Sequence, residues 1–212
     1  TGTSDGVETV EVYVTAGNQF TSGLTNTAAN INFIYYYGST GSESISGGAM
    51  SETISGGAGN DLLIGGGAAD TYVFELATNN GIDRLTFGVV NGSAVDDILD
   101  FSVNVFLGDG TPDIGLITES TADTTLTSDQ AGDNILILQN ARFADAAALS
   151  LSTMLFADVF STDGKVLFIY ASSDTTDARI AIATISNAGS ISAAVDVAVL
   201  VGVTISEAVT GL

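Results

Sequence analysis

Residues 38–73 carry four nine-residue segments in direct succession: GSTGSESIS, GGAMSETIS, GGAGNDLLI and GGGAADTYV. In every segment the first residue is glycine, the sixth is an acid and the eighth is large and apolar. The acids are Glu43, Glu52, Asp61 and Asp70, and the apolar residues are Ile45, Ile54, Leu63 and Tyr72. A flexible glycine-rich loop does not place large apolar side chains at a period of nine residues. The segments therefore predict a repeating structure of the type G-G-x-G-x-D-x-U-x, where U is large and apolar.

The spacing predicts a turn followed by a short strand in each segment. The first six residues form the turn, since glycine permits positive φ and lets backbone carbonyls point inward. The last three form a strand whose central side chain fills a core. Each segment is then half a coil, so the turn at 38–43 stacks on the turn at 56–61, and 47–52 stacks on 65–70. A stacked pair of turns offers the oxygen ligands that Ca²⁺ prefers.

We expect two calcium sites, one bound by the carboxylates of Glu43 and Asp61 and one bound by those of Glu52 and Asp70. Only residues 56–61 satisfy the whole turn pattern, so glycines of that turn and the next join the expected site: Gly56, Gly57, Gly59 and Gly65. Elsewhere the pattern lacks glycine at Ser39, Met50 and Ala68. Glutamate, with its longer arm, fits a tight turn less well than aspartate. We therefore expect the first two turns to bind weakly or to stack without metal.

The composition is strongly acidic, with 25 acids against 4 basic residues and a formal net charge of −21. A compact chain with this charge repels itself unless counterions bind. Four scattered cations form no basic patch, which excludes nucleic acid as a partner and disfavours anionic membranes unless calcium bridges the two. The chain has no histidine and no cysteine, which removes the usual triads, thiol nucleophiles and imidazole metal sites. Paired carboxylates for glycoside hydrolysis are available, but no two stand out, so no enzyme is expected.

Without cysteine, stability must come from burial and metal. With 212 residues and 45% hydrophobic content, the chain can bury one large core or two small ones. The chain begins at Thr1 without a signal peptide, which predicts the end of a longer protein. The longest apolar stretch, residues 193–205, is short and contains Asp196, so we expect no transmembrane segment.

The remaining sequence predicts an all-β protein, with a parallel β-roll or β-solenoid followed by a β-sandwich-like cap. The expected domains are irregular solenoid coils at 1–37, the calcium β-roll at 38–75 and the cap at 76–212. Strands are expected at 7–14, 31–37, 84–90, 98–106, 134–138, 179–185 and 195–204, and a short helix at 141–149. The segments 154–160 and 165–171 flank STDG and predict a β-hairpin.

Two further features have competing interpretations. The run Tyr35, Tyr36, Tyr37 fits a carbohydrate-binding patch, but alternate core and surface positions of one strand are favoured. Several acids lie in predicted turns: Asp96, Asp97, Asp100, Asp109, Asp113, Asp174 and Asp177. The segment DGTPD at 109–113 lacks the spacing and distant glutamate of an EF-hand. A solvated turn residue is the favoured role for these acids.

The nonapeptides resemble those of RTX (repeats-in-toxin) proteins, which Gram-negative bacteria export by type I secretion. GGGAADTYVF at 65–74 looks like the typical exit from an RTX roll. VDDILDF at 95–101 and GDGTPDI at 108–114 are similar to the D-x-I-x-D-F…G-x-D-x-I segment that follows it. This similarity adds Asp100 and Asp109 to the expected calcium ligands. The resemblance also implies an uncleaved export signal in the last several dozen residues, with the type I secretion machinery as a partner.

GVETVEVYVTAG at 6–17 is similar to segments that recur in RTX surface-layer (S-layer) proteins. The resemblance implies a secreted, cell-surface structural protein, either an S-layer protein or an adhesin, which calcium folds and links to neighbouring copies. The alternative is the carboxy-terminal export and folding domain of a secreted RTX hydrolase or toxin. Sequence upstream would discriminate them, since further G-[IV]-E-T segments favour the first and a histidine-rich metal motif or G-x-S-x-G favours the second.

Overall fold

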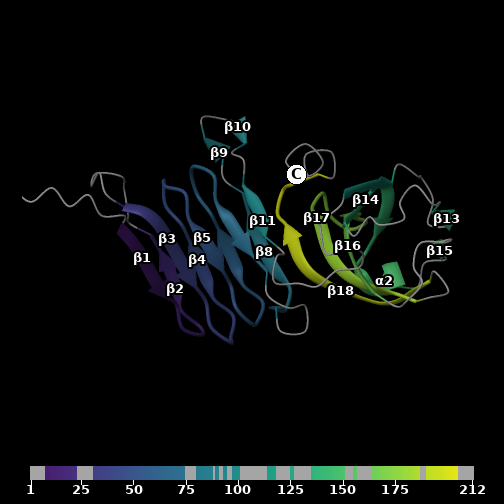
Figure 1. The fold of residues 1–212 in the computed structure, drawn as a ribbon, viewed down its shortest axis with the longest axis horizontal. Helices are drawn as coiled ribbons and strands as arrows, with labels where there is room; N and C mark the ends of the chain where they lie inside the picture. The colour runs from purple at the N-terminus through teal and green to yellow at the C-terminus, as the bar shows by residue number, and fades with distance from the viewer. Residues whose placement is uncertain are drawn as a thin grey trace, which may run out of the picture. The chain divides into compact units, whose positions relative to one another are not determined.

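Short strands in the amino-terminal half of the chain alternate between two parallel sheets (Figure 1). The computed structural model describes residues 8–22, 31–74, 80–87, 89–90, 93–94, 97–100, 114–117, 125–126, 135–150, 155–156, 164–186 and 190–204. One sheet has the order β1 (Glu8–Tyr13), β3 (Ile31–Tyr37), β5 (Thr53–Ser55), β7 (Thr71–Val73) and β11 (Ile98–Asp100). The other contains β2 (Gln19–Thr21), β4 (Ser44–Ser46), β6 (Leu62–Ile64) and β8 (Asp83–Thr86). Neighbours within each sheet pair in parallel.

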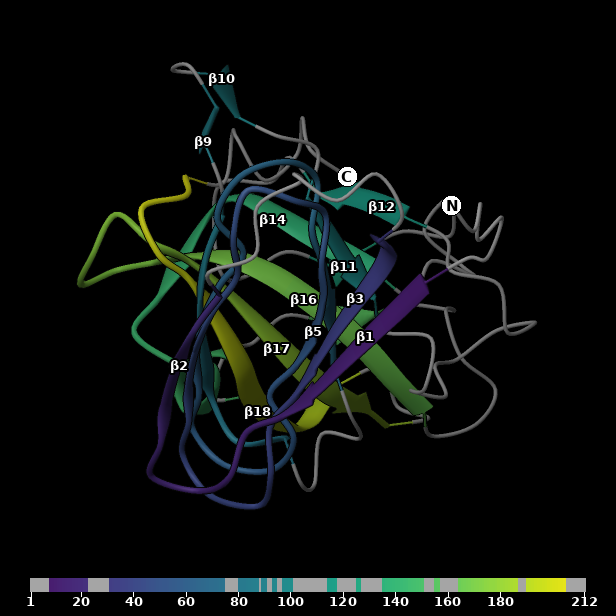
Figure 2. The ribbon, with the colours of Figure 1, turned by 90° about the vertical axis from the view of Figure 1, so that its left-hand side faces the viewer.

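The repeat dictates this alternation because each segment ends in a three-residue strand. Strands β4 to β7 occupy the last three residues of the four segments, as the period predicted. Their central side chains face inward and are almost fully buried: Ile45, Ile54, Leu63 and Tyr72, each at most 1% exposed. Figure 2 shows β1, β3 and β5 on one side of this stack and β2 on the other. The apolar position eight thus forms the core between the two sheets.

The stack continues beyond the four segments on both sides. Strands β1 and β3 lie where 7–14 and 31–37 were predicted. On β3, Tyr36 is buried, whereas Tyr35 and Tyr37 are only half-buried, so the predicted alternation along one strand is confirmed. After the segments, β8 pairs with β6 and β11 pairs with β7. Both strands fall in the region assigned to the cap, and the expected division at residue 75 stays a prediction.

Two of the predicted strands in this half differ in extent. The strand expected at 84–90 ends at Thr86, and β9 (Val89–Val90) instead pairs antiparallel with β10 (Ser93–Ala94). The strand expected at 98–106 begins at Ile98, and its part beyond Asp100 lies outside the described residues.

Contacts divide the chain into two units, Thr1–Val103 and Asn104–Leu212. The second unit contains a mixed sheet with the order β12 (Ile114–Ile117), β14 (Ile135–Phe143), β16 (Gly164–Ser172), β17 (Ala178–Ile185) and β18 (Ile191–Leu200). Strands β12, β14 and β16 are parallel, and β17 and β18 add antiparallel strands. Helix α2 (Ala146–Ser150) packs against β18 and β14, and β13 (Thr125–Leu126) pairs in parallel with β15 (Leu155–Phe156). The chain is therefore mostly β, with parallel and mixed sheets; the sandwich expected for the cap stays a prediction.

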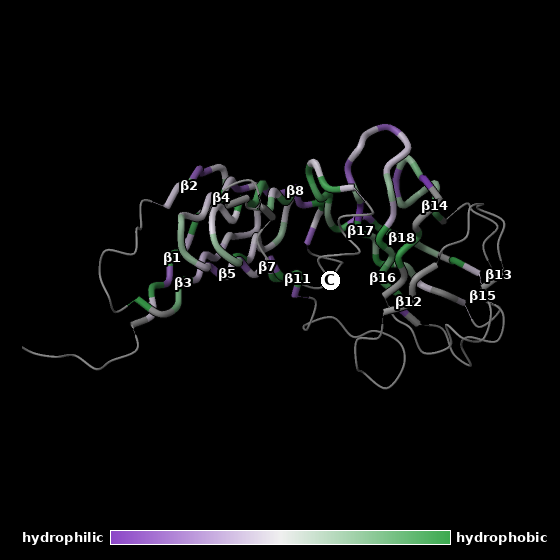
Figure 3. Tube along the Cα trace, turned by 90° about the horizontal axis from the view of Figure 1, so that it is seen from above, coloured by the Kyte–Doolittle hydropathy of each residue, from purple (hydrophilic) through white to green (hydrophobic). Residues whose placement is uncertain are grey.

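Strand β16 forms the centre of the second unit because its side chains are apolar on both faces. Val166, Phe168 and Tyr170 join the core on one face with α2, and all three are fully buried. Figure 3 shows hydrophobic segments gathered along β16 and β18. Near-continuous apolar runs are typical of strands buried on both faces.

One sequence prediction in the second unit is wrong, and two others differ in extent from the observed elements. The hairpin of 154–160 with 165–171 does not form, because β16 pairs with β14 and β17 and β15 pairs with β13. The observed hairpin joins β16 to β17. The helix expected at 141–149 begins only at Ala146, since β14 runs through Phe143. The last predicted strand, 195–204, is observed at Ile191–Leu200. Among the described residues, no helix has the length and apolarity needed to cross a membrane.

Candidate metal centre in the stacked turns

The four position-six acids lie inside the stack rather than on its surface. Glu43, Glu52, Asp61 and Asp70 are between 0% and 4% exposed. Each ends a turn and directly precedes a strand, so the buried residue two positions later anchors it. Buried carboxylates are unfavourable unless hydrogen bonds or cations compensate the lost hydration. The partners of these carboxylates therefore decide what the site can bind.

The backbone N–H of one acid donates a hydrogen bond to the side-chain carboxylate of the acid two segments later. The N–H of Glu43 donates to Asp61 Oδ1 at 2.7 Å, and the N–H of Glu52 donates to Asp70 Oδ1 at 2.9 Å. Both contacts join residues 18 positions apart, which is two segments. Turns two segments apart therefore stack on each other, as the period predicted, and the binding of calcium by these pairs of acids stays a prediction.

Two further acids extend these contacts. The N–H of Asp61 donates to Asp83 Oδ1 at 3.0 Å, and the N–H of Asp70 donates to Asp97 Oδ1 at 2.9 Å. We call Glu43, Asp61 and Asp83 the first ladder, and Glu52, Asp70 and Asp97 the second ladder. Sequence reasoning missed Asp83 and treated Asp97 as a solvated turn acid. A signal existed, because each precedes a leucine by two residues, at Leu85 and Leu99, as in the repeats.

Two of the predicted glycines let stacked turns approach closely. Gly57 and Gly59 have φ of +81° and +126°, and a Cβ on either would overlap a carbonyl oxygen of the turn below. Gly56 and Gly65 instead lie against carboxylates: a Cβ would be 3.1 Å from Cγ of Asp61 at Gly56, and 2.8 Å from Cγ of Asp70 at Gly65. The structure thus places Gly56 and Gly65 against the carboxylates of Asp61 and Asp70, and Gly57 and Gly59 against the backbone of the turn at 38–43.

Protein donors satisfy the two outer carboxylates of the first ladder. Ser39 donates its backbone N–H to Glu43 Oε2 at 2.8 Å and its hydroxyl to Glu43 Oε1 at 2.9 Å. The side-chain amide of Asn80, which is fully buried, donates to Asp83 Oδ2 at 3.0 Å. Both carboxylates therefore exchange water for hydrogen bonds within the chain.

On the second ladder, the N–H of Gly48 donates to Glu52 Oε1 at 3.3 Å. Within the described part of the chain, Glu52 Oε2 and Asp70 Oδ2 are buried and accept no hydrogen bond, and the same holds for Asp61 Oδ2 on the first ladder. Burial raises the pKa of Glu52, and burial together with the adjoining Glu52 raises the pKa of Asp70 to about 8. Two carboxylates that adjoin each other in a dry site need a proton or a cation between them.

The atoms around this pair suit a hard divalent cation. A Cβ placed on Gly47 would lie 2.6 Å from Glu52 Oε2 and would overlap the carbonyl oxygen of Gly65. Carboxylate and carbonyl oxygens together are the ligands of Ca²⁺ sites. No group of three or more acids, histidines or cysteines converges in the residues the structure describes. Backbone carbonyls must therefore complete the coordination, and the glycine turns supply them. The residues present fit the expected ion.

The two other predicted ligands are Asp100 and Asp109. Asp100 lies at the end of β11, three residues beyond Asp97, and its carbonyl oxygen accepts the N–H of Phe74 at 2.9 Å. Asp109 lies outside the described residues, as do Asp96 and Asp113. Asp174 and Asp177 lie in the turn between β16 and β17, the role expected for them.

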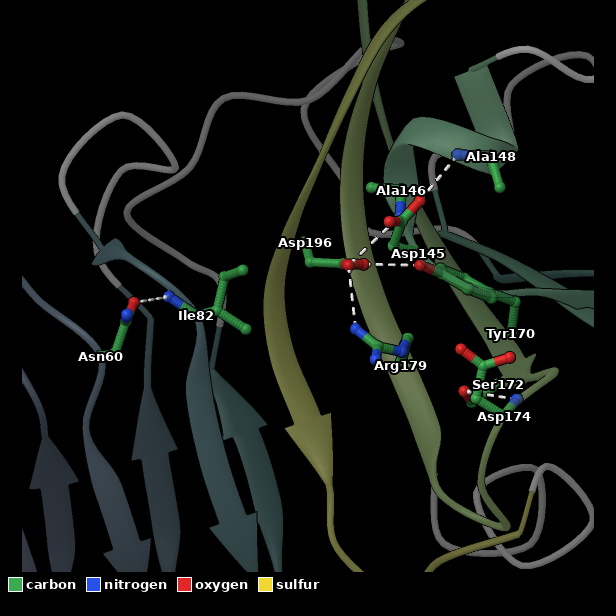
Figure 4. A network of polar contacts seen from close by, with 10 residues as sticks. All are labelled: Asn60, Ile82, Asp145, Ala146, Ala148, Tyr170, Ser172, Asp174, Arg179 and Asp196. Atoms are coloured by element: carbon green, nitrogen blue, oxygen red, sulfur yellow. Dashed lines mark hydrogen bonds and ion pairs between the residues drawn. The ribbon is translucent and has the colours of Figure 1, made fainter.

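A second buried carboxylate, Asp196, organises the carboxy-terminal unit (Figure 4). It accepts the hydroxyl of Tyr170 at 2.6 Å and the N–H of Ala146 at 3.2 Å, and it pairs with Arg179 at 3.1 Å. Burial and the hydrogen bond to Asp196 raise the pKa of Tyr170. The network ties the start of α2 to three strands and leaves Asp196 satisfied, so its role is structural. The lone acid in an apolar run was the sequence signal for it.

Comparison of the chain with protein-family models, with curated proteins and with solved structures finds no match in any of the three.

Proposed function

We propose that the repeat region is a calcium-stabilised β-roll, and that the chain is the calcium-dependent folding and assembly module of an extracellular bacterial structural protein. The observation that carries the proposal is the adjoining, buried pair of Glu52 and Asp70, with one oxygen of each accepting no hydrogen bond in the described part of the chain. Such a pair is costly without a cation and favourable with one. The parallel pairing of alternate strands, which stacks the turns, supports the β-roll.

Calcium suits the site better than other common ions. The available donors are carboxylate and carbonyl oxygens, which favour hard cations, and the chain has no histidine or cysteine for zinc or copper. Magnesium demands near-ideal octahedral geometry and loses its water reluctantly, so irregular glycine turns suit it poorly. Extracellular calcium modules bind at roughly 10⁻⁴–10⁻³ M, far above the concentration of free calcium in the cytosol.

The extracellular, structural role rests on composition and on the resemblance of the repeats to RTX proteins. A chain of net charge −21 without cysteine gains stability from calcium where the ion is abundant. Before export, low cytosolic calcium would leave the repeats unfolded and able to pass the type I secretion machinery. Surface assembly into an S-layer or adhesin is the role that we propose, and catalysis is not part of it.

Calcium titration into chelated protein tests the proposal. Circular dichroism should show a gain of β-structure, and the melting temperature should rise with calcium because the ion binds the folded state. Glu52→Gln should shift the transition to higher calcium concentration, since it removes one charge from the pair. Magnesium at the same concentrations serves as the control ion. An unchanged β-signal and an unchanged melting temperature in calcium would refute the proposal.

A further inference from the structure

The outer face of β1 and β3, which lie side by side in Figure 2, carries a row of aromatic side chains. Phe33, Tyr35 and Tyr37 occupy every second position of β3, on the face opposite the buried Tyr36. The parallel register places Tyr13 of β1 beside Tyr37. The alternation that buries Tyr36 therefore also builds an aromatic surface, and the two interpretations of the tyrosine run are compatible.

Three of these rings hold one another in position. The ring centroids of Tyr13 and Tyr37 are 5.2 Å apart with 21° between their planes, and those of Tyr35 and Tyr37 are 6.1 Å apart with 4° between their planes. Tyr13 nevertheless remains 71% exposed. Because Tyr37 stacks on one face of the Tyr13 ring, the exposed part is the other face and the hydroxyl edge. A ring that is already ordered loses little conformational entropy when a ligand packs on it.

Polar groups surround the rings on the same face. The hydroxyl of Tyr13 donates to Glu11 Oε2 at 3.1 Å, and Glu11 is an exposed residue opposite Tyr35. An ionised carboxylate has about four lone-pair sites, so this contact leaves Glu11 able to accept hydrogen bonds from a ligand. Strands β5 and β7 continue the face with Thr53 and Thr71, two partly exposed residues with hydroxyl groups. The face thus combines aromatic rings with hydrogen-bond donors and acceptors.

The charge of this face selects the kind of ligand that it can bind. No lysine or arginine precedes Arg84 in the sequence, so β1, β3, β5 and β7 carry no cation. An anionic ligand is repelled, and a second copy would bring its own Glu11 against this acidic face. A neutral saccharide avoids both costs. Its weakly electropositive C–H bonds pack on the negative faces of aromatic rings, and its hydroxyls donate to carboxylates.

We propose that the outer face of β1 and β3 binds a neutral saccharide chain, with one pyranose ring stacked on Tyr13 and hydroxyls of that sugar donating to Glu11. Phe33, an exposed ring further along β3, extends the surface for other sugar units. This inference does not depend on the proposed calcium binding, because the acids assigned to calcium are buried inside the stack. The backbone edge of β1 is a separate surface from this face.

Native gel electrophoresis of the 212-residue chain, in calcium and in gels that contain a neutral polysaccharide, tests the proposal. The probes are mixed-linkage β-glucan, galactomannan and dextran, and a gel without polysaccharide gives the reference mobility. At least one of the three should retard the protein. Tyr13→Ala should lower the association constant at least about fivefold because a stacking surface is lost, whereas Tyr13→Phe keeps the ring and most of the binding. Leu62→Ala is the matched control, since it removes an exposed apolar side chain from β6 of the other sheet.

Several results would overturn the proposal. Retardation by none of the three polysaccharides does so, as does retardation that Tyr13→Ala leaves unchanged or that Leu62→Ala weakens equally. Circular dichroism checks that each variant is folded. If Tyr13→Ala does not fold, Glu11→Gln takes its place, and unchanged retardation in that variant contradicts the assignment. If Tyr13→Ala instead prevents calcium-induced light scattering and no polysaccharide retards the protein, the face binds a second copy rather than a saccharide.

Discussion

Glutamate stands at position six of the first two segments, yet its two side chains meet different neighbours. Ser39, which replaces a glycine of the repeat, donates twice to Glu43. The equivalent residue before Glu52 is Gly48, which has only its backbone N–H to donate. One hydroxyl at the second position of a segment therefore gives Glu43 a hydrogen-bond donor that Glu52 lacks at the same place.

Ser39→Ala should destabilise the protein by about 1–3 kcal/mol, because a buried carboxylate loses a charge-assisted hydrogen bond. The free energy of unfolding in saturating calcium, from urea denaturation, measures the effect. Ser42→Ala is the matched control, since its hydroxyl is on an exposed turn and accepts only a 3.3 Å contact from the N–H of Asn60. Equal losses in the two variants would contradict the role of Ser39.

Acid should partly replace calcium at Asp70. Folding raises its pKa from 3.8 to about 8, so between these values the folded, calcium-free protein binds a proton that the unfolded chain does not. Stability contributed by this proton is complete below pH about 4 and is lost as the pH rises toward 8. Calorimetry of chelated protein should therefore give a higher melting temperature at pH 5 than at pH 8.

The control for this pH dependence is Asp70→Asn. Acidification also lowers the repulsion among all the acids of a −21 chain, which raises stability in both proteins. Only the unaltered chain has the additional gain from Asp70, so its melting temperature should rise more steeply as the pH falls. Parallel pH profiles for the two proteins would show that Asp70 does not carry the effect.

At the residue scale, the sequence predicts the acids of the repeat but not their partners. Position six follows from the period, and the burial of all four acids follows from the stacking. The nine-residue period does not predict Asp83 and Asp97. Asp83 lies 22 residues after Asp61 and Asp97 lies 27 residues after Asp70, whereas acids within the repeats contact each other at a separation of 18 residues. The role of Asn80 depends on the same irregular coil and could not be predicted without the three-dimensional contact.

At the element scale, each three-residue strand contributes one core side chain and two outer ones. Ile54→Ala on β5 should cost about 2–5 kcal/mol, because it leaves a cavity at a position with 0% exposure. Leu62→Ala on β6 should cost much less, since Leu62 is 36% exposed and faces outward. Urea denaturation in calcium measures both. Similar costs would mean that the position-eight side chains do not form the core.

The sequence predicted the strands of the repeats, whose pairing partners lie one coil away along the chain. It did not predict the pairing in the second unit, where the partners are farther apart in sequence. In the repeats, a strand and its neighbour share one pattern, so β4 to β7 follow from the period alone. In the second unit, β14 pairs with β16 across a connection that includes α2, and β16 turns back to β17. A local STDG turn signal could not outweigh the two long apolar strands that flank β16.

At the scale of the whole molecule, charge opposes association while strand edges favour it. Among the described residues, β1 and β11 are the edge strands of one sheet of the first unit, and β2 is an edge strand of the other. Tyr13 and Phe33, on β1 and its neighbour β3, are 71% and 50% exposed. Open strand edges beside exposed aromatic rings are typical association surfaces. A net charge of −21 keeps two copies apart until cations neutralise it.

Calcium should therefore promote ordered self-association at concentrations above those that fold the monomer. On the proposed function, the first ions should bind the buried acids and fold the chain, and further ions should then bridge surface acids of neighbouring copies. Light scattering across a calcium series measures the assembly, and circular dichroism on the same samples marks the folding transition. Magnesium should replace calcium poorly, because it keeps its water and its octahedral geometry. A protein that folds in calcium yet stays monomeric at high concentration would contradict the assembly role and favour the export and folding domain of a secreted hydrolase or toxin.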